Sequence, residues 1–411
     1  MNNTNSVKNS KRIWSRRGFI ATVTGTGAFM MASPFRAWAA ADIDPAAYDS
    51  DPRVAAIVAK TIGIDTHNHI DVPLDTDELP GPGADLSGEM GKSGLSAICM
   101  TFATDYKRNV QPGEAYQRFL TGVTAMDAML ARNKMKRSFN LTDLQKAHDA
   151  HQSTVIQSIE GCHFLEGKLD RMEIAYQRGV RHLGLLHDSN ASVPLGDVYT
   201  NSPELGGLTT FGGEVIKECN RLGMLVDLAH ASNDTIDAAL KITAHPVLIS
   251  HTGLDTQLGQ NPNMAKMMRP RLISKEQARI VADAGGVIGV WTHLADTPLE
   301  YAQNIRALVD VIGVEHVGIG TDTKLTPPYR SPKSNVGGPG GPGGPGGPGG
   351  PGGPGGGRPG ERTNTAWADQ DGGFYYAVVD ALLKTGFSEA EIGKIGGGNF
   401  CRIFDAATTG H

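Results

Sequence analysis

The sequence predicts an α/β protein built as one (β/α)8 TIM barrel. Three observations support this prediction. Eight short apolar runs alternate with amphipathic stretches. The runs are nearly continuous in Val, Ile, Leu and Gly, as parallel strands buried on both faces are. Most of them end on a residue that can bind a metal or move a proton. Such alternation implies right-handed βαβ units, and eight units close into a barrel.

The expected strands lie near Thr61–His67, Ala97–Thr104, Thr154–Glu160, Val180–His187, Met224–His230, Pro246–His251, Gly286–His293 and His316–Asp322. Amphipathic stretches between them predict helices over Gly113–Lys134, Gly212–Leu222, Asp234–Ile242, Ser274–Ala284 and Pro298–Ile312. A last helix near Gly373–Thr385 and the segment GGGNFCRIF are expected to close this single domain, residues 40–411.

Residues 1–39 are predicted to be a twin-arginine signal peptide. The sequence SRRGFI at residues 15–20 precedes a mildly apolar run and then Ala37-Trp38-Ala39, an A-x-A cleavage site. The run is too short and too rich in Gly and Thr to span a bilayer, so no transmembrane segment is expected in the mature chain. We therefore expect an exported protein, periplasmic or secreted.

Charge and cysteine content exclude other classes of protein. Removing residues 1–39 removes six basic residues and no acidic one, which leaves 32 of the 38 basic residues against 43 acidic ones. An acidic surface argues against nucleic acid as a partner. The four cysteines are far apart and form no C-x-x-C pair, so neither a zinc ribbon nor a disulfide framework is indicated.

Residues 337–354 are six GGP triplets, followed by three more glycines to residue 357. One short tract inside a globular chain favours a solvated, flexible insertion over a collagen-like structure. It follows the eighth predicted strand, so a lid is the alternative interpretation.

Polar residues at the strand ends predict a metal centre. His67 and His69 are separated by one residue, so in a strand both side chains point to the same face. Glu160, His230 and His251 end later strands, and the carboxyl ends of barrel strands converge on the face that holds the active site. Four histidines and a carboxylate suit two Zn²⁺ ions, or other divalent metals, sharing the carboxylate.

Seven segments resemble successive blocks of the renal (membrane) dipeptidase family of the amidohydrolase superfamily: GIDTHNHID, QSIEGCHFLEG, GVRHLGLLHDSN, GLTTFGGEVIKECNRLGMLVDLAHAS, PVLISHTG, HVGIGTD and GGGNFCRIF. The resemblance covers roughly residues 60–323 and 370–404, in the family's order. It implies a binuclear zinc hydrolase that cleaves dipeptides, which often tolerates a D-residue at the carboxyl end. Family members are often homodimers.

The resemblance also implies a role for each matching residue. His67 and position 69 would hold the first zinc, Glu160 would bridge, and His230 with His251 would hold the second. His187 would stabilise the oxyanion and Asp322 would shuttle the proton. Arg271 would pair with a free carboxylate of the substrate. His163 and His293 are weaker candidates, for residues that support the ligands or face the pocket.

Three departures from the family's pattern concern specificity more than metal chemistry. The first clamp is H-x-H where the family has H-x-D, so a neutral ligand replaces a negative one. Thr323-Lys324-Leu325 replaces the usual Phe-Asp-Gly, and the usual histidine and asparagine around Arg271 are missing. Two alternatives to a dipeptidase therefore stay open: a related amidohydrolase acting on N-acyl amino acids, lactams or lactones, and a metal-binding barrel without turnover.

Overall fold

The computed structural model describes residues 51–105, 111–329, 331, 360–370 and 372–411. The predicted signal peptide and the GGP tract lie outside these residues. The strands are β1 (Ile64–His69), β2 (Ala97–Thr101), β3 (Thr154–Ile159), β4 (Val180–Gly184), β5 (Leu225–Asp227), β6 (Leu248–Thr252), β7 (Val287–Val290) and β8 (Val317–Ile319). They are parallel and pair in chain order, and β8 returns to β1 through Ile319 and Asp65. The predicted (β/α)8 barrel is confirmed.

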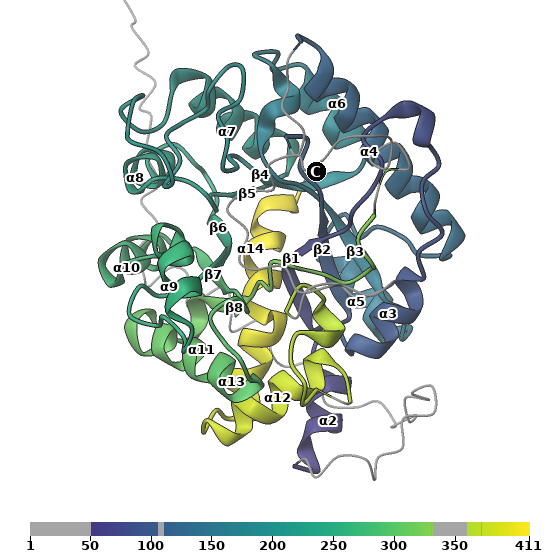
Figure 1. The fold of residues 1–411 in the computed structure, drawn as a ribbon, viewed down its shortest axis with the longest axis vertical. Coiled ribbons are helices and arrows are strands. Elements are labelled where there is room, and N and C mark those ends of the chain that lie inside the picture. The colour runs from purple at the N-terminus through teal and green to yellow at the C-terminus, as the bar shows by residue number, and fades with distance from the viewer. Residues whose placement is uncertain (1–50, 106–110, 330, 332–359, 371) are drawn as a thin grey trace, which may run out of the picture. The chain divides into compact units, whose positions relative to one another are not determined.

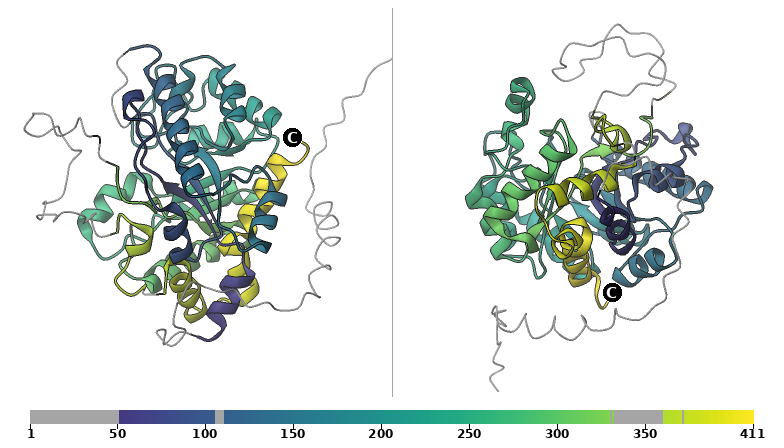
Figure 2. Two further views of the ribbon diagram at one scale, coloured as in Figure 1. Left: turned by 90° about the vertical axis from the view of Figure 1, so that its right-hand side faces the viewer. Right: turned by 90° about the horizontal axis from the view of Figure 1, so that it is seen from below.

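Helices surround the strands (Figures 1 and 2). They are α2 (Arg53–Lys60), α3 (Leu86–Ser93), α4 (Glu114–Arg132), α5 (Leu141–Asp149), α6 (Arg171–Gln177), α7 (Thr210–Leu222), α8 (Asn233–Leu240), α9 (Pro262–Met268), α10 (Lys275–Asp283), α11 (Pro298–Ile312), α12 (Phe374–Lys384), α13 (Glu389–Gly393) and α14 (Asn399–Thr408). None of the helices in the described part of the chain has the length and apolar character needed to cross a membrane.

Local sequence fixes where the predicted helices begin. Hydroxyl side chains cap α7, α8, α10 and α11, where Thr209, Ser232, Ser274 and Thr297 each accept a hydrogen bond from a backbone N–H of the first turn. Gly223, with φ of 74°, ends α7 in the left-handed conformation that glycine adopts without strain. Capping residues of this kind are visible in a sequence, which is why predicted and observed bounds agree closely.

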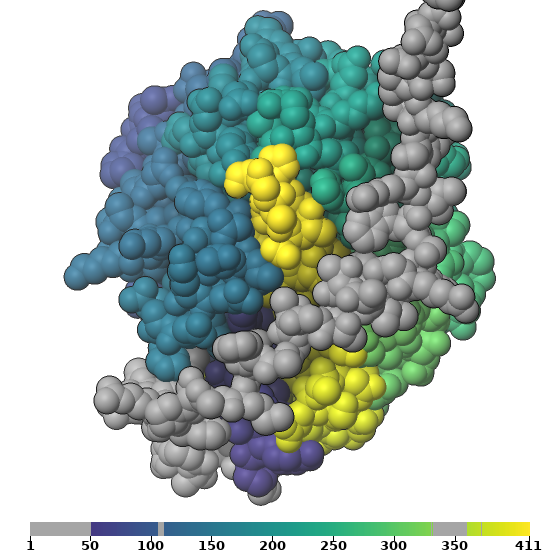
Figure 3. Space-filling model, turned by 180° about the vertical axis from the view of Figure 1, so that it is seen from behind, coloured from purple at the N-terminus to yellow at the C-terminus, as the bar shows by residue number. Residues whose placement is uncertain are grey.

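The last helix closes the amino-terminal end of the barrel. Phe400, Ile403 and Phe404 of α14 are buried against the first residues of the strands, among them Ile64 and Leu225. Figure 3 shows the carboxyl-terminal residues, in yellow, seated across the middle of this face. Because α14 closes this end, the opposite face, at the carboxyl ends of the strands, is the one left for a site.

A short ninth strand, β9 (Thr323–Lys324), lies beside the carboxyl end of β1 and was not predicted. Thr323 is paired with Asn68 and Lys324 with His69. The Lys324 Nζ atom lies 2.9 Å from Asp71 and 3.2 Å from Glu361. The departure from the family's pattern at residues 323–325 therefore places the lysine in ion pairs at the barrel rim.

Candidate metal centre

Five predicted site residues converge around Glu160, which follows β3 directly. The Oε1 atom of Glu160 lies 3.3 Å from His67 Nε2, 3.0 Å from His230 Nε2 and 3.6 Å from His251 Nε2. Its Oε2 atom lies 3.5 Å from His187 Nε2 and 3.8 Å from His69 Nε2. A carboxylate between two groups of imidazoles is the arrangement that the sequence predicted for a bridging ligand.

The histidines form two pairs on either side of this carboxylate. His67 and His69, both on β1, bring their Nε2 atoms to 3.2 Å. His230, after β5, and His251, on β6, bring theirs to 2.9 Å. Asp322 joins the first pair, since its Oδ1 atom lies 3.0 Å from His69 Nε2. His187 joins the second group through Glu160 and His230.

Hydrogen bonds to the Nδ1 atoms of His67 and His251, on the side away from Glu160, fix the tautomers of these two rings. The Ser250 hydroxyl donates to Asp227 Oδ2 at 2.6 Å, so its oxygen accepts from the rings beside it. Those rings are His251, with Nδ1 at 2.9 Å, and His67, with Nδ1 at 3.3 Å. Their Nδ1 atoms are therefore protonated, and the Nε2 lone pairs point into the centre.

This donor set fits divalent metal ions. Two imidazole nitrogens on one tetrahedral zinc, each at about 2.0–2.1 Å, are separated by about 3.3 Å, close to the distances within the two pairs. The Glu160 Oε2 atom is buried and accepts no hydrogen bond from the residues that the structure describes. Lone pairs that face one another around a buried carboxylate are stabilised by a cation between them.

The electrostatics of the centre favour positive charge. Burial raises the pKa of Glu160, but the nearby His187, His67 and His69 outweigh this and hold it well below its ordinary value. Burial lowers the pKa of His230, whereas Asp188 and Glu160 raise it to about 10. The carboxylates thus remain ionised, and the negative field that attracts a proton to His230 also attracts a metal cation.

Two of the site residues have strained backbone. His230 has φ of 66° and Asp322 has φ of 56°, a conformation that costs free energy for residues other than glycine. Hydrogen bonds hold Asp322 there: its N–H donates to the His67 carbonyl, and the preceding Thr321 N–H donates to the buried Asp65 at 2.9 Å. These bonds turn Asp322 over the centre, although β8 itself ends at Ile319.

The two weaker candidates both contact the site. His293 Nε2 lies 2.7 Å from Asp322 Oδ2. His163 Nε2 lies 2.9 Å from the Ser189 carbonyl oxygen and 3.6 Å from Asp105 Oδ2. His293 therefore touches the acid of the site directly, whereas His163 supports the residues around His187.

Asp105 supports the site but was not predicted from the sequence. It accepts hydrogen bonds from His187 Nδ1 at 2.8 Å and from the Ser189 hydroxyl at 2.5 Å. Burial raises its pKa, but hydrogen bonding and charge from His187 lower it overall, so Asp105 is ionised. This carboxylate orients His187 with Nε2 toward Glu160.

Asp188 is the second carboxylate that sequence analysis missed, and it joins Arg271 to the metal centre. One of its oxygens, Oδ1, accepts a hydrogen bond from His230 Nδ1 at 3.0 Å. The other, Oδ2, accepts one from Arg271 Nη2. Tyr199 completes the group, with its hydroxyl 2.9 Å from His230 Nδ1. The predicted carboxylate-binding arginine is therefore already paired with an acid of the same chain.

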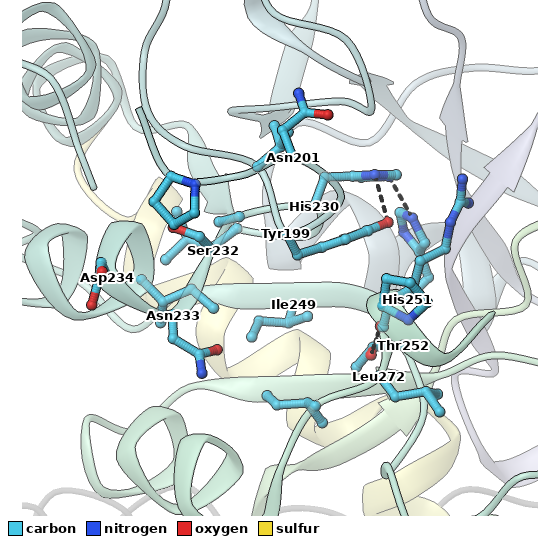
Figure 4. Close-up of a pocket in the computed structure, with 18 residues that line it drawn as sticks. Tyr199, Asn201, His230, Ser232, Asn233, Asp234, Ile249, His251, Thr252 and Leu272 are labelled. Carbon is cyan, nitrogen blue, oxygen red and sulfur yellow. Dashed lines mark hydrogen bonds between the residues drawn. The ribbon is translucent and has the colours of Figure 1, made fainter. Parts of the chain in front are cut away.

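A cavity of about 500 Å³ opens beside His230 and His251. Figure 4 shows these two histidines at one end, with Ser232, Asn233 and Asp234 at the other. Ile249 lies between the two ends, Leu272 lies near Thr252 and His251, and Arg271 is also part of the wall. This volume is within the usual range for small-molecule pockets, about 300–1,000 Å³.

Comparison with known families agrees with this geometry. Residues 52–328, more than half of the chain, match the model of Membrane dipeptidase (Peptidase family M19). The chain belongs to this family. Family M19 consists of metallopeptidases, so divalent metal use is expected at the histidine and carboxylate clusters. The resemblance found in the sequence is thereby confirmed.

Sequence identity to three individual relatives ranges from 16% to 32%. The chain is 32% identical over 170 residues to Dipeptidase verJ of Clonostachys rogersoniana, a match that covers 40% of this chain and 41% of that relative. An amidohydrolase of Pseudomonas aeruginosa has a TM-score of 0.63 at 21% identity, covering 86% of this chain and 99% of its own. A metallopeptidase of Rhodobacter sphaeroides, liganded with a phosphinate mimic of L-Ala-D-Ala, has a TM-score of 0.60 at 16% identity, covering 84% and 99%. These structures share the barrel fold.

Proposed function

We propose that this protein is a metal-dependent hydrolase that cleaves the amide bond of dipeptides and dipeptide-like substrates. The position of Glu160 carries the proposal, because it lies between two histidine pairs with Asp322 on one side and His187 on the other. Family membership favours peptides over N-acyl amino acids, lactams and lactones. The complete donor set, together with Asp322, argues against a barrel that only binds metal.

Two divalent ions, zinc by the preference of the donors, would be held by the pair His67 and His69 and by the pair His230 and His251, with Glu160 shared. When bound, they supply Lewis acidity, which polarises a carbonyl group and lowers the pKa of water. The outer hydrogen bonds of Ser250 and Asp188 hold the rings for this task.

Asp322 is the general base and acid of the proposed reaction. It takes a proton from the attacking water and delivers it to the leaving amine. Burial raises its pKa, but His251 and His293 outweigh this and hold it well below its ordinary value, so the carboxylate is ionised. His187, oriented by Asp105, donates through Nε2 to the oxyanion that develops on the carbonyl. Arg271 faces the carboxyl end of the substrate.

Metal analysis coupled to a dipeptide library, with L- and D-residues at the carboxyl end, tests this function. We expect about two zinc ions per chain and hydrolysis of several dipeptides. A chain that carries two metal ions and cleaves no dipeptide in the library would contradict the proposal.

We also propose that residues 1–39 direct export by the twin-arginine route and that residues 40–411 form the mature hydrolase. The support is the order of the twin arginines, the apolar run and Ala37-Trp38-Ala39. Replacing Arg16 and Arg17 by lysine should retain the protein in the cytoplasm of a bacterial host. Unchanged export of that variant would contradict this route.

A further inference from the structure

The Asp188 side chain is fixed at three points between the metal centre and Arg271. Its Oδ1 atom lies 3.0 Å from His230 Nδ1 and 3.4 Å from the Tyr199 hydroxyl, and its Oδ2 atom is bonded to Arg271 Nη2. His230 is buried and Tyr199 is half-buried, and they come from different loops of the barrel. Partners on both oxygens hold this carboxylate between the metal centre and Arg271.

The ion pair with Asp188 changes which group of a substrate Arg271 can bind. The side chains of Arg271 and Asp188 are 28% and 34% exposed, so solvent screens their charges only in part. A substrate carboxylate that bound Arg271 would lie within a few ångströms of the Asp188 charge, and like charges at this separation oppose binding. The remaining N–H groups of the guanidinium can serve a neutral carbonyl oxygen without this repulsion.

Away from the histidine end, the basic side chain that this cavity offers to a carboxylate is Arg271. Among the described residues that line the cavity, Arg271 is the one arginine or lysine and Asp234 is the one acidic residue. Apart from the two histidines, the other described wall residues are apolar or uncharged, with Leu272 near His251, Ile249 in the middle and Asn233 near the far end (Figure 4). The cavity runs away from the histidines toward Asn233, so it leaves room for a substituent beyond the second residue of a peptide.

We propose that this site accepts peptides whose terminal carboxyl group is masked as an amide, and that Asp188 determines this preference. The inference rests on the proposed function, and it names the class of substrate for the same site. Asp188 neutralises the arginine that would otherwise select a free carboxylate, and the part of the cavity between Ile249 and Asn233 accommodates the masking group.

Matched substrates that differ only in the terminal group test the proposal. The metal-loaded enzyme is given one dipeptide as the free acid and as the carboxamide, and kcat/KM is measured for both. We expect the preference for the free acid to be below tenfold. The Asp188→Asn variant keeps an oxygen that accepts from His230 Nδ1 but removes the charge, so its preference should move toward the free acid by about tenfold.

A preference of tenfold or more for the free acid in the unaltered enzyme would overturn the proposal, as would an unchanged preference in Asp188→Asn. Asp310→Asn, an exposed change on α11, is the control and should leave the ratio unaltered. Inhibition by a phosphinate dipeptide mimic, as free acid and as carboxamide, measures the same preference without turnover. Hydrolysis of neither substrate with a full complement of metal would instead contradict the proposed function.

Discussion

The Nε2 atom of His293 lies 2.7 Å from the Oδ2 atom of Asp322, so the histidine after β7 is the direct partner of the acid after β8. The other oxygen of Asp322 lies 3.0 Å from His69 Nε2. The carboxylate is thus held at both oxygens, in a residue with φ of 56°. Such a carboxylate loses little conformational entropy when it acts, which suits proton transfer at a fixed position.

Replacing Asp322 by asparagine should abolish turnover and leave metal binding nearly intact. Asparagine preserves the shape of the side chain but cannot accept a proton, and general acid and base catalysis contributes about 10²–10⁴-fold to rate. We expect a loss of kcat of about 10³-fold or more, with metal content measured on the same sample. A zinc-loaded variant that keeps a tenth of the activity would remove Asp322 from this role.

His293→Ala should lower kcat by about tenfold and leave KM and metal content unchanged, because the histidine holds Asp322 and contacts neither histidine pair in the described structure. His293→Gln should recover part of the loss, since its amide can donate a hydrogen bond in the same direction. If His293→Ala reduced metal content instead, the histidine would have a different function.

Much of the site could be predicted because a barrel converts strand order into spatial proximity. His67, Glu160, His230 and His251 are far apart in sequence, yet each lies near or just beyond the carboxyl end of a strand, and the closure of β8 on β1 brings them together. The apolar runs also gave the strand positions. Several expected strands were too long at the carboxyl end: β5 ends at Asp227, three residues before His230, because the backbone leaves the sheet to present the ligand.

The residues around the ligands could not be predicted in the same way. Asp105 follows β2 and Asp188 follows β4, and one sequence does not show that they contact His187 and His230. Each is an ordinary acidic residue until tertiary structure supplies its partner. Asp188 immediately follows His187, so its position beside a predicted site residue was the one available sign. The role of α14 in closing the barrel likewise depends on packing over a long sequence separation.

His69→Asp should move the acid limb of the pH profile of kcat/KM to higher pH, by about one unit. A carboxylate at this position adds a negative charge, which disfavours deprotonation of the groups around it and so raises their pKa. Metal content should remain near that of the unaltered enzyme, because carboxylates also bind zinc. An acid limb at the same pH would mean that this departure from the family's pattern is electrostatically neutral.

Removal of metal by a chelator should abolish hydrolysis and lower the melting temperature, and added zinc should restore both. Without a cation, the Nε2 atoms of His230 and His251 face each other at 2.9 Å beside ionised Glu160. A ligand that binds only the folded state stabilises that state by about 4 kcal/mol when its free concentration is a thousandfold above Kd.

Glu160→Ala should bind less metal than His69→Ala, because Glu160 contacts both pairs. Equal metal loss in the two variants would contradict the shared role.

Phe404→Ala should destabilise the mature protein by about 3–5 kcal/mol without changing the metal site. Phe404 is fully buried and stacks on Phe400 with ring centroids 5.5 Å apart, against the first residues of the strands. The truncation leaves a cavity at the end of the barrel opposite Glu160, so kcat at low temperature should stay within about twofold of its original value. Denaturant unfolding of the metal-loaded protein measures the loss of stability.

Asp405→Ala, an exposed change on the same helix, controls for helix propensity and should alter stability by less than about 1 kcal/mol. If Phe404→Ala instead reduced kcat strongly in fully folded protein, α14 would be coupled to the active face and would not simply close the barrel.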